Sequence, residues 1–169
     1  MELILVRHSI AEEREEFAKK SSEDHLRPLT LKGRKRAQKV AMQMRDWVGD
    51  DIDVIVSSPF TRARQTAEIF SQIFMDLKVL EAPELVPNAP PAAFLKWLKA
   101  HAKNYRRVLA VGHEPHLSVF ASYMLCGKEE SLLEVKKGAV VGLELESFNL
   151  GLAAKARLQY LLPPKFIVD

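Results

Sequence analysis

The chain has 169 residues, of which 47% are hydrophobic, a net charge of +3 and a single cysteine, Cys126. This composition excludes a disordered protein, and a chain of this length buries roughly 70% of its unfolded surface as one domain. No apolar run approaches the ~18 residues of a membrane span, and one cysteine excludes an internal disulfide framework. The N-terminal MELILVRHS lacks the basic segment and cleavage site of a signal peptide. We therefore expect one domain over residues 1–169, located in the cytoplasm, without membrane contact.

Apolar β-branched runs alternate with helical patterns, which is typical of an α/β fold with a largely parallel sheet. In chain order, the patterns predict a strand at 2–7, helix 31–48, strand 52–57, helix 59–74, strand 77–81, helix 91–103, strand 107–112, helix 115–125 and strands 139–146 and 155–162. A short loop through Phe148, Asn149 and Gly151 joins the last two strands, so they are predicted to form an antiparallel hairpin. We expect a mixed, mostly parallel sheet with helices on both faces.

The helix predicted at 31–48 carries an apolar stripe at the i, i+3, i+4, i+7 spacing. The stripe consists of Ala37, Val40, Ala41, Met44, Trp47 and Val48. Basic residues interleave with it, namely Lys32, Arg34, Lys35, Arg36, Lys39 and Arg45. A basic stretch can contact nucleic acid, but this interleaving favours a solvated helix face. We therefore expect no nucleic-acid partner.

Two of the predicted helices begin directly after strands. Ser58-Pro59 predicts an N-cap serine before a first-turn proline, and Glu114-Pro115 starts the helix at 115–125, with Glu114 as its expected N-cap. Their free N–H groups and positive dipole ends then lie at the carboxyl edge of the sheet. Anionic ligands bind at such an edge.

Two arginines and two histidines lie at or just beyond the strand ends at this edge. Arg7 and His8 end the first strand, Arg62 lies in the first turn beyond Ser58, and His113 follows strand 107–112. Arginine offers planar, permanently charged donors for phosphate oxygens. A neutral imidazole beside such charges can attack phosphorus, and a second histidine can stabilise the transferring phosphoryl group. Each residue alone would more often be structural, but together they predict a phosphoryl-transfer site.

The segments LVRHSIAEE, RPLTLKGRKRA, VSSPFTRARQTAE and AVGHEP, in this order and spacing, resemble the histidine phosphatase superfamily. The short chain, with its RH and RPLT motifs, is most similar to the SixA-type protein phosphohistidine phosphatases. The resemblance implies a phosphoglycerate mutase-like fold in which His8 becomes phosphorylated. It further implies that Arg7, Arg62 and His113 bind the phosphoryl group and that Arg27 lies at the pocket rim. No metal site or cofactor is expected.

The general acid is left open by the resemblance. Mutase-like members carry it on a long insertion, but the stretch APELVPNAPP here is short. Asp24 and Glu84 are the candidates, and an ordinary surface role is equally open for each. Ser9 stands where glycine is commonest after the nucleophilic histidine, which leaves the local backbone geometry open.

The short insertions also bear on the substrate. Little chain is available for a lid, so we expect a shallow, open site, which suits a phosphorylated side chain of another protein. A phosphoimidazole has a leaving group of pKa ~6.5 and needs little help from an acid. We therefore expect a metal-independent phosphohistidine phosphatase of signal transduction that acts as a monomer. The alternatives are a phosphatase of small phosphorylated metabolites and a non-catalytic phosphate-binding module on the same fold.

Overall fold

The computed structural model describes residues 1–146 and 156–167, and its centre is a six-stranded mixed sheet. The strands are β1 (Glu2–Arg7), β2 (Val54–Ser57), β3 (Val79–Glu81), β4 (Arg107–Gly112), β5 (Val140–Leu145) and β6 (Ala156–Leu162), in the order β3-β2-β4-β1-β5-β6. The strands β3, β2, β4 and β1 run parallel to one another, whereas β5 runs antiparallel to both β1 and β6. The predicted hairpin is confirmed, and its loop through Phe148, Asn149 and Gly151 lies outside the described residues.

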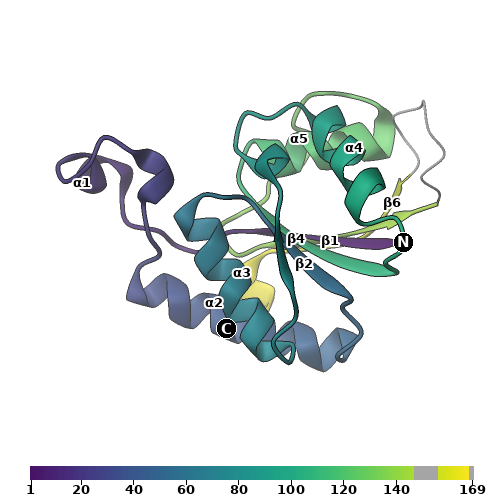
Figure 1. Ribbon diagram of the computed structural model, residues 1–169, viewed down its shortest axis with the longest axis horizontal. Coiled ribbons are helices and arrows are strands. Elements are labelled where there is room, and N and C mark those ends of the chain that lie inside the picture. The colour runs from purple at the N-terminus through teal and green to yellow at the C-terminus, as the bar shows by residue number, and fades with distance from the viewer. Residues whose placement is uncertain (147–155, 168–169) are drawn as a thin grey trace.

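Among the described residues, the four longest helices cover the sheet, two on each face (Figure 1). They are α2 (Leu31–Val48) and α3 (Thr61–Ile73) on one face and α4 (Pro91–His101) and α5 (His116–Cys126) on the other. Successive strand residues point to opposite faces, so Ile4 packs with α2 and α3 while Leu3 and Leu5 pack with α4 and α5. Strands buried on both faces are apolar almost throughout. The predicted α/β class is confirmed.

Most predicted ranges differ from the observed ones by only one or two residues at an end. The start of α3 is a correction: Phe60 precedes the helix in an extended conformation, so Ser58 is not its N-cap. Trp47 is a second correction, because it is 49% exposed rather than part of the buried stripe of α2. At 3.6 residues per turn it falls at the margin of that stripe. Met44, nearer the centre, is buried.

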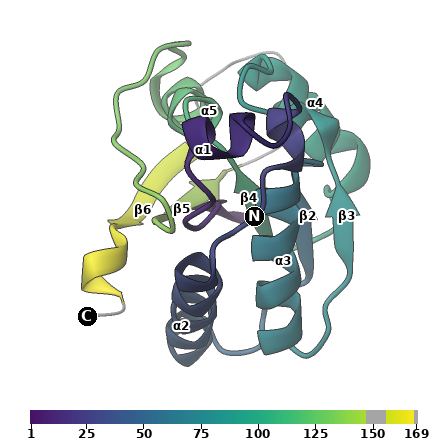
Figure 2. The same cartoon turned by 90° about the vertical axis from the view of Figure 1, so that its left-hand side faces the viewer.

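An arm between β1 and α2 has no counterpart among the predicted elements. It covers residues 10–30 and includes the short helix α1 (Arg14–Ala18) and the 3₁₀ turn η1 (Asp24–Leu26). Its two limbs are joined by a bridge between Ala11 and Leu29. The arm extends beyond α2 and α3 in Figure 1, and Figure 2 views the molecule from that side, with α1 in front of the sheet. The arm therefore lies where β1 ends.

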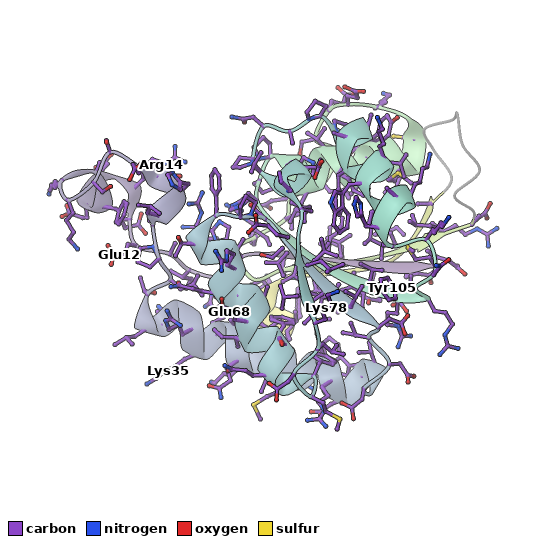
Figure 3. The ribbon with its side chains drawn as sticks, in the orientation of Figure 1. Glu12, Arg14, Lys35, Glu68, Lys78 and Tyr105 are labelled. Atoms are coloured by element: carbon purple, nitrogen blue, oxygen red, sulfur yellow. The ribbon has the colours of Figure 1, made fainter. Side chains whose placement is uncertain are left out.

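The basic residues of α2 are solvated, as predicted. Lys32, Arg34, Lys35, Lys39 and Arg45 are exposed, and Lys35 lies on the outer side of the helix, away from the sheet (Figure 3). Within residues 1–146 and 156–167, no helix is long and apolar enough to cross a membrane.

Candidate active site

The register of the parallel strands brings His8 and His113 to one edge. Arg7 pairs with Gly112, and the backbone N–H of His8 donates to the Gly112 carbonyl at 3.0 Å. The next residue along β4 is His113, and the centroids of the two imidazole rings are 5.0 Å apart. β2 ends at the same level and contributes Ser58, whose backbone N–H also bonds to β4. The prediction that His8 and His113 lie together at the carboxyl edge of the sheet is confirmed.

His8 is buried and held in one tautomer. Its Nδ1 lies 2.7 Å from the carbonyl oxygen of Ser9. A carbonyl can only accept a hydrogen bond, so Nδ1 carries the proton and Nε2 keeps its lone pair. Burial, together with the positive charges of Arg62 and Arg7, lowers the pKa of His8 to about 3. The imidazole is therefore neutral at physiological pH, and Nε2 keeps the lone pair that a nucleophile needs, here as the acceptor of a hydrogen bond from Arg62 Nε.

Arg62, in the first turn of α3, contacts both His8 and the arm. Its Nε donates to His8 Nε2 at 3.3 Å, Nη1 donates to the Asp24 carbonyl at 2.9 Å, and Nη2 donates to the Asp24 carboxylate at 3.1 Å. The guanidinium carbon is 5.1 Å from the centroid of the Phe60 ring. An arginine near a helix N-terminus is disfavoured by the helix dipole. Here the carboxylate of Asp24 compensates, in the way a bound anion could.

Arg7 and Arg27 approach from two other directions. Arg7 Nη1 donates to the Val135 carbonyl at 2.8 Å, and its buried Nε has no hydrogen-bond partner among the described residues. Arg27 lies in the arm, where Nη1 donates to the Glu12 carbonyl at 2.7 Å and Nε to Asp24 at 2.9 Å. Coulombic effects of both arginines reach His8. Arg62 is thus in direct contact with His8, Arg7 is the residue that precedes His8, and Arg27 is linked to Arg62 through Asp24.

His113 contacts a group that the sequence did not suggest. Its Nε2 lies 2.8 Å from Ser58 Oγ, and the Phe60 ring meets it edge-on with centroids 5.0 Å apart. Burial lowers the pKa of His113 to about 2, and His8 and Arg62 add to this effect. Its Nδ1 is buried without a partner in the described part of the chain. The ring therefore retains a polar atom that a ligand could engage.

His116 is a third buried histidine, one turn beyond His113. It is 2% exposed and packs between Phe94 and Phe120, with ring centroids 6.0 and 6.1 Å away. Neither ring nitrogen has a partner among the described residues, and burial lowers the pKa of His116 to about 4. The sequence analysis did not single out His116. Its position next to the Gly-His-Glu-Pro segment was the available signal.

The two acid candidates lie in different surroundings. Burial raises the pKa of Asp24, but Arg62, Arg27 and Arg14 outweigh it, and the pKa lies below its ordinary value. Asp24 is thus ionised at neutral pH. Glu84 belongs to the 3₁₀ turn η2 (Pro83–Leu85), and its buried Oε2 has no partner in the described residues. Glu114, expected as an N-cap, lies one residue before the actual N-cap Pro115, but its carboxylate does accept the N–H of Ser118 at 3.1 Å.

The central side chains of the site have little exposed surface. His8 is 5% exposed, Arg62 2% and His113 1%. The segment 82–91 is short, as the sequence analysis noted, but the arm supplies cover instead. Arg14 and Glu12 lie on this arm (Figure 3), and Arg14 joins Asp24 at 3.4 Å. The expectation of a shallow, open site overlooked the arm, because its apolar residues are too few to form a periodic pattern.

Small side chains explain how the arm and α2 approach His8. Ser9 is fully buried, and its Oγ donates to the Gly33 carbonyl at 2.8 Å, so serine fits where glycine was expected. Thr30 caps α2 by accepting the Gly33 N–H at 3.0 Å. A Cβ at Gly33 would lie 1.9 Å from the Ile10 carbonyl oxygen. Glycine is therefore required for this close approach of α2 to the arm.

No group of three or more His, Cys, Asp or Glu side chains in the described residues is arranged to hold a metal ion. The charged groups around His8 are predominantly cationic. Such a set of donors is suited to an oxyanion.

Known proteins resemble this chain over nearly its full length. A family profile described as "Histidine phosphatase superfamily (branch 1)" matches residues 3–86. An uncharacterized protein of Picosynechococcus sp. is 33% identical over 169 residues, which cover 99% of each chain. A solved structure of the protein histidine phosphatase SixA with tungstate superposes with a TM-score of 0.78, at 23% identity and 98% coverage of both chains. The α-ribazole phosphatase of Shigella flexneri gives 0.74, at 19% identity and 97% coverage of both. These structures share the fold, and together with the profile match they show that the chain belongs to the histidine phosphatase superfamily.

Proposed function

We propose that this chain is a metal-independent phosphatase that hydrolyses phosphohistidine on proteins through a phosphorylated His8. The observation that carries the proposal is the state of His8. It is a neutral imidazole whose proton is held on Nδ1 by a backbone carbonyl, and its Nε2 faces the guanidinium of Arg62. A nucleophile that is already unprotonated needs no adjacent base.

In the proposed reaction, His8 Nε2 attacks the phosphorus atom. Arg7, Arg62 and His113 hold the equatorial oxygens, and Arg27 contributes positive charge at the rim. As the new P–N bond forms, the bond to the leaving group breaks. Water then attacks the phosphorylated His8 and releases inorganic phosphate.

The lack of a preset acid supports phosphohistidine as the substrate. Asp24 is ionised and forms ion pairs with Arg27 and Arg62. Among the described residues, no hydrogen bond joins Glu84 to Arg7, His8, Arg62 or His113. An alkoxide leaving group requires a proton from a placed acid, whereas a phosphoimidazole can take a proton from solvent on its other ring nitrogen, whose pKa is near the ~6.5 of histidine, and then leaves as neutral imidazole. The SixA structure belongs to a protein histidine phosphatase, which agrees with this choice. The α-ribazole phosphatase shows that the same fold also serves a small substrate.

The test compares kcat/KM for a phosphohistidine peptide, a phosphoserine peptide and sugar phosphates above neutral pH, where phosphohistidine survives. We expect at least a tenfold preference for phosphohistidine. His8→Ala should abolish turnover on every substrate while circular dichroism stays unchanged.

Each other outcome identifies one of the alternatives. A preference for sugar phosphates would indicate a phosphatase of small metabolites. Binding of tungstate without turnover of any substrate would indicate a non-catalytic phosphate-binding module. Equal rates on both peptides would contradict the phosphohistidine assignment.

A further inference from the structure

A groove of about 450 Å³ is lined at one point by Arg7, the residue that precedes His8. Five parts of the chain line it: the end of β1, the start of the arm at Ile10, α2, residues 136 and 137 before β5, and the 3₁₀ turn η3 (Pro164–Phe166) with the preceding Pro163. The described lining includes five basic residues and no acidic one. These are Arg7, Arg36, Lys136, Lys137 and Lys165. We call this feature the basic groove.

The basic groove is fixed to the candidate active site through the backbone of Arg7. The Arg7 N–H donates to the Ala139 carbonyl at 3.1 Å, and the Gly138 N–H donates to the Arg7 carbonyl at 3.1 Å. The Arg7 side chain adds its bond to Val135. Lys136 and Lys137 lie between these anchored residues. The two lysines are therefore carried by the same short segment that holds a phosphoryl-binding arginine.

The positive charge of the groove is weakly compensated within the described residues. Lys136 pairs with Glu134 at 3.7 Å, and both side chains are more than half exposed. An exposed pair of this kind is worth little. No ion pair of the described residues involves Arg36, Lys137 or Lys165. Within the described residues, the positive charges of Arg36, Lys136, Lys137 and Lys165 are therefore largely uncompensated and could bind an anionic group.

We propose that the basic groove binds acidic residues that flank the phosphorylated side chain of a protein substrate. This inference rests on the proposed function and adds a specificity determinant to it. The charges are spread over three separate elements, as the carboxylates of an extended peptide would be. Pro163 and Pro164 provide apolar surface between them, against which the stems of glutamate side chains can pack. A single small phosphoester would engage only one end of the groove.

The test uses two triple variants that remove the same charge. The groove variant carries Lys136→Gln, Lys137→Gln and Lys165→Gln. The control variant carries Lys32→Gln, Lys35→Gln and Lys39→Gln, all on the exposed face of α2. The substrates are phosphohistidine peptides flanked by glutamates or by glutamines, and p-nitrophenyl phosphate.

For the groove variant we expect kcat/KM on the glutamate-flanked peptide to fall about tenfold, mainly through KM. Each exposed charge contributes about two- to fivefold, and the three act together. The glutamine-flanked peptide and p-nitrophenyl phosphate should be unaffected. The control variant should retain wild-type values on all three, which excludes a general effect of net charge. Added salt should reduce the wild-type preference for glutamates.

A binding measurement separates this inference from the proposed function. Fluorescence anisotropy of a labelled, unphosphorylated glutamate-rich peptide should show about tenfold weaker binding to the groove variant than to wild type, whether or not the protein turns over phosphohistidine. Equal binding to wild type and to both variants would overturn the groove assignment. So would equal kcat/KM of wild type and the groove variant on the glutamate-flanked peptide.

Discussion

Three buried histidines make the stability of this protein sensitive to mild acid. His8, His113 and His116 have pKa values lowered by burial to about 3, 2 and 4, whereas each has its ordinary value of 6.5 when unfolded. Between pH 6.5 and 4 the unfolded chain therefore binds protons that the folded chain does not. Stability rises with pH wherever the unfolded state binds more protons. The contribution of neutral burial is thus fully present above pH 6.5 and is lost as the pH falls.

The magnitude at pH 5 depends little on the individual folded values, because pH 5 lies above all three. Each histidine then costs about 2 kcal/mol relative to pH 8, from 1.36 kcal/mol per pH unit over roughly 1.5 units. The three together cost about 6 kcal/mol, a large part of the 5–15 kcal/mol typical of a domain. Asp24 remains ionised at pH 5. Glu114, whose pKa burial raises, opposes the trend only slightly.

Urea unfolding at pH 8 and pH 5 measures this loss. For wild type we expect the free energy of unfolding to fall by about 6 kcal/mol. His116→Phe, which places an aromatic ring between Phe94 and Phe120, should reduce the loss to about 4 kcal/mol. His101→Gln is the control, since His101 is exposed. A wild-type loss below 2 kcal/mol, or the same loss in His116→Phe as in wild type, would refute the reasoning.

Four further predictions concern the site and its support. Arg62→Ala should lower kcat/KM on the order of 10³-fold, whereas Arg64→Ala, at an exposed position, should change little; similar losses would mean that Arg62 is not a phosphoryl donor. Gly33→Ala should cost about 3 kcal/mol or more in urea unfolding, because its Cβ would lie 1.9 Å from the Ile10 carbonyl oxygen. Asp24→Asn should tighten competitive inhibition by tungstate about three- to tenfold, because it frees Arg62 from a competing carboxylate, and EDTA should leave activity unchanged. Weaker tungstate inhibition in Asp24→Asn would show that Asp24 positions Arg62 instead.

Local patterns were sufficient to locate the central residues of the site. A buried parallel strand appears in the sequence as a short apolar run, and an amphipathic helix appears as apolar residues that recur every 3.6 positions. Both can therefore be recognised without knowledge of tertiary contacts. The order of these elements places His8, Arg62 and His113 at one edge, since parallel strands share their carboxyl ends. The prediction therefore depended only on element type and direction.

The α/β class, the elements and the edge at which the candidate site residues gather all followed from the amino-acid sequence. What surrounds those residues depends on tertiary packing. The pairing of Arg62 with Asp24 joins residues 38 positions apart, and that of His113 with Ser58 joins residues 55 apart. Such contacts follow from how the arm and the ends of the strands pack, which no periodic pattern encodes. The same reason applies to the basic groove, where Arg36 and Lys165 come together only because α2 and η3 lie beside the segment that holds Arg7.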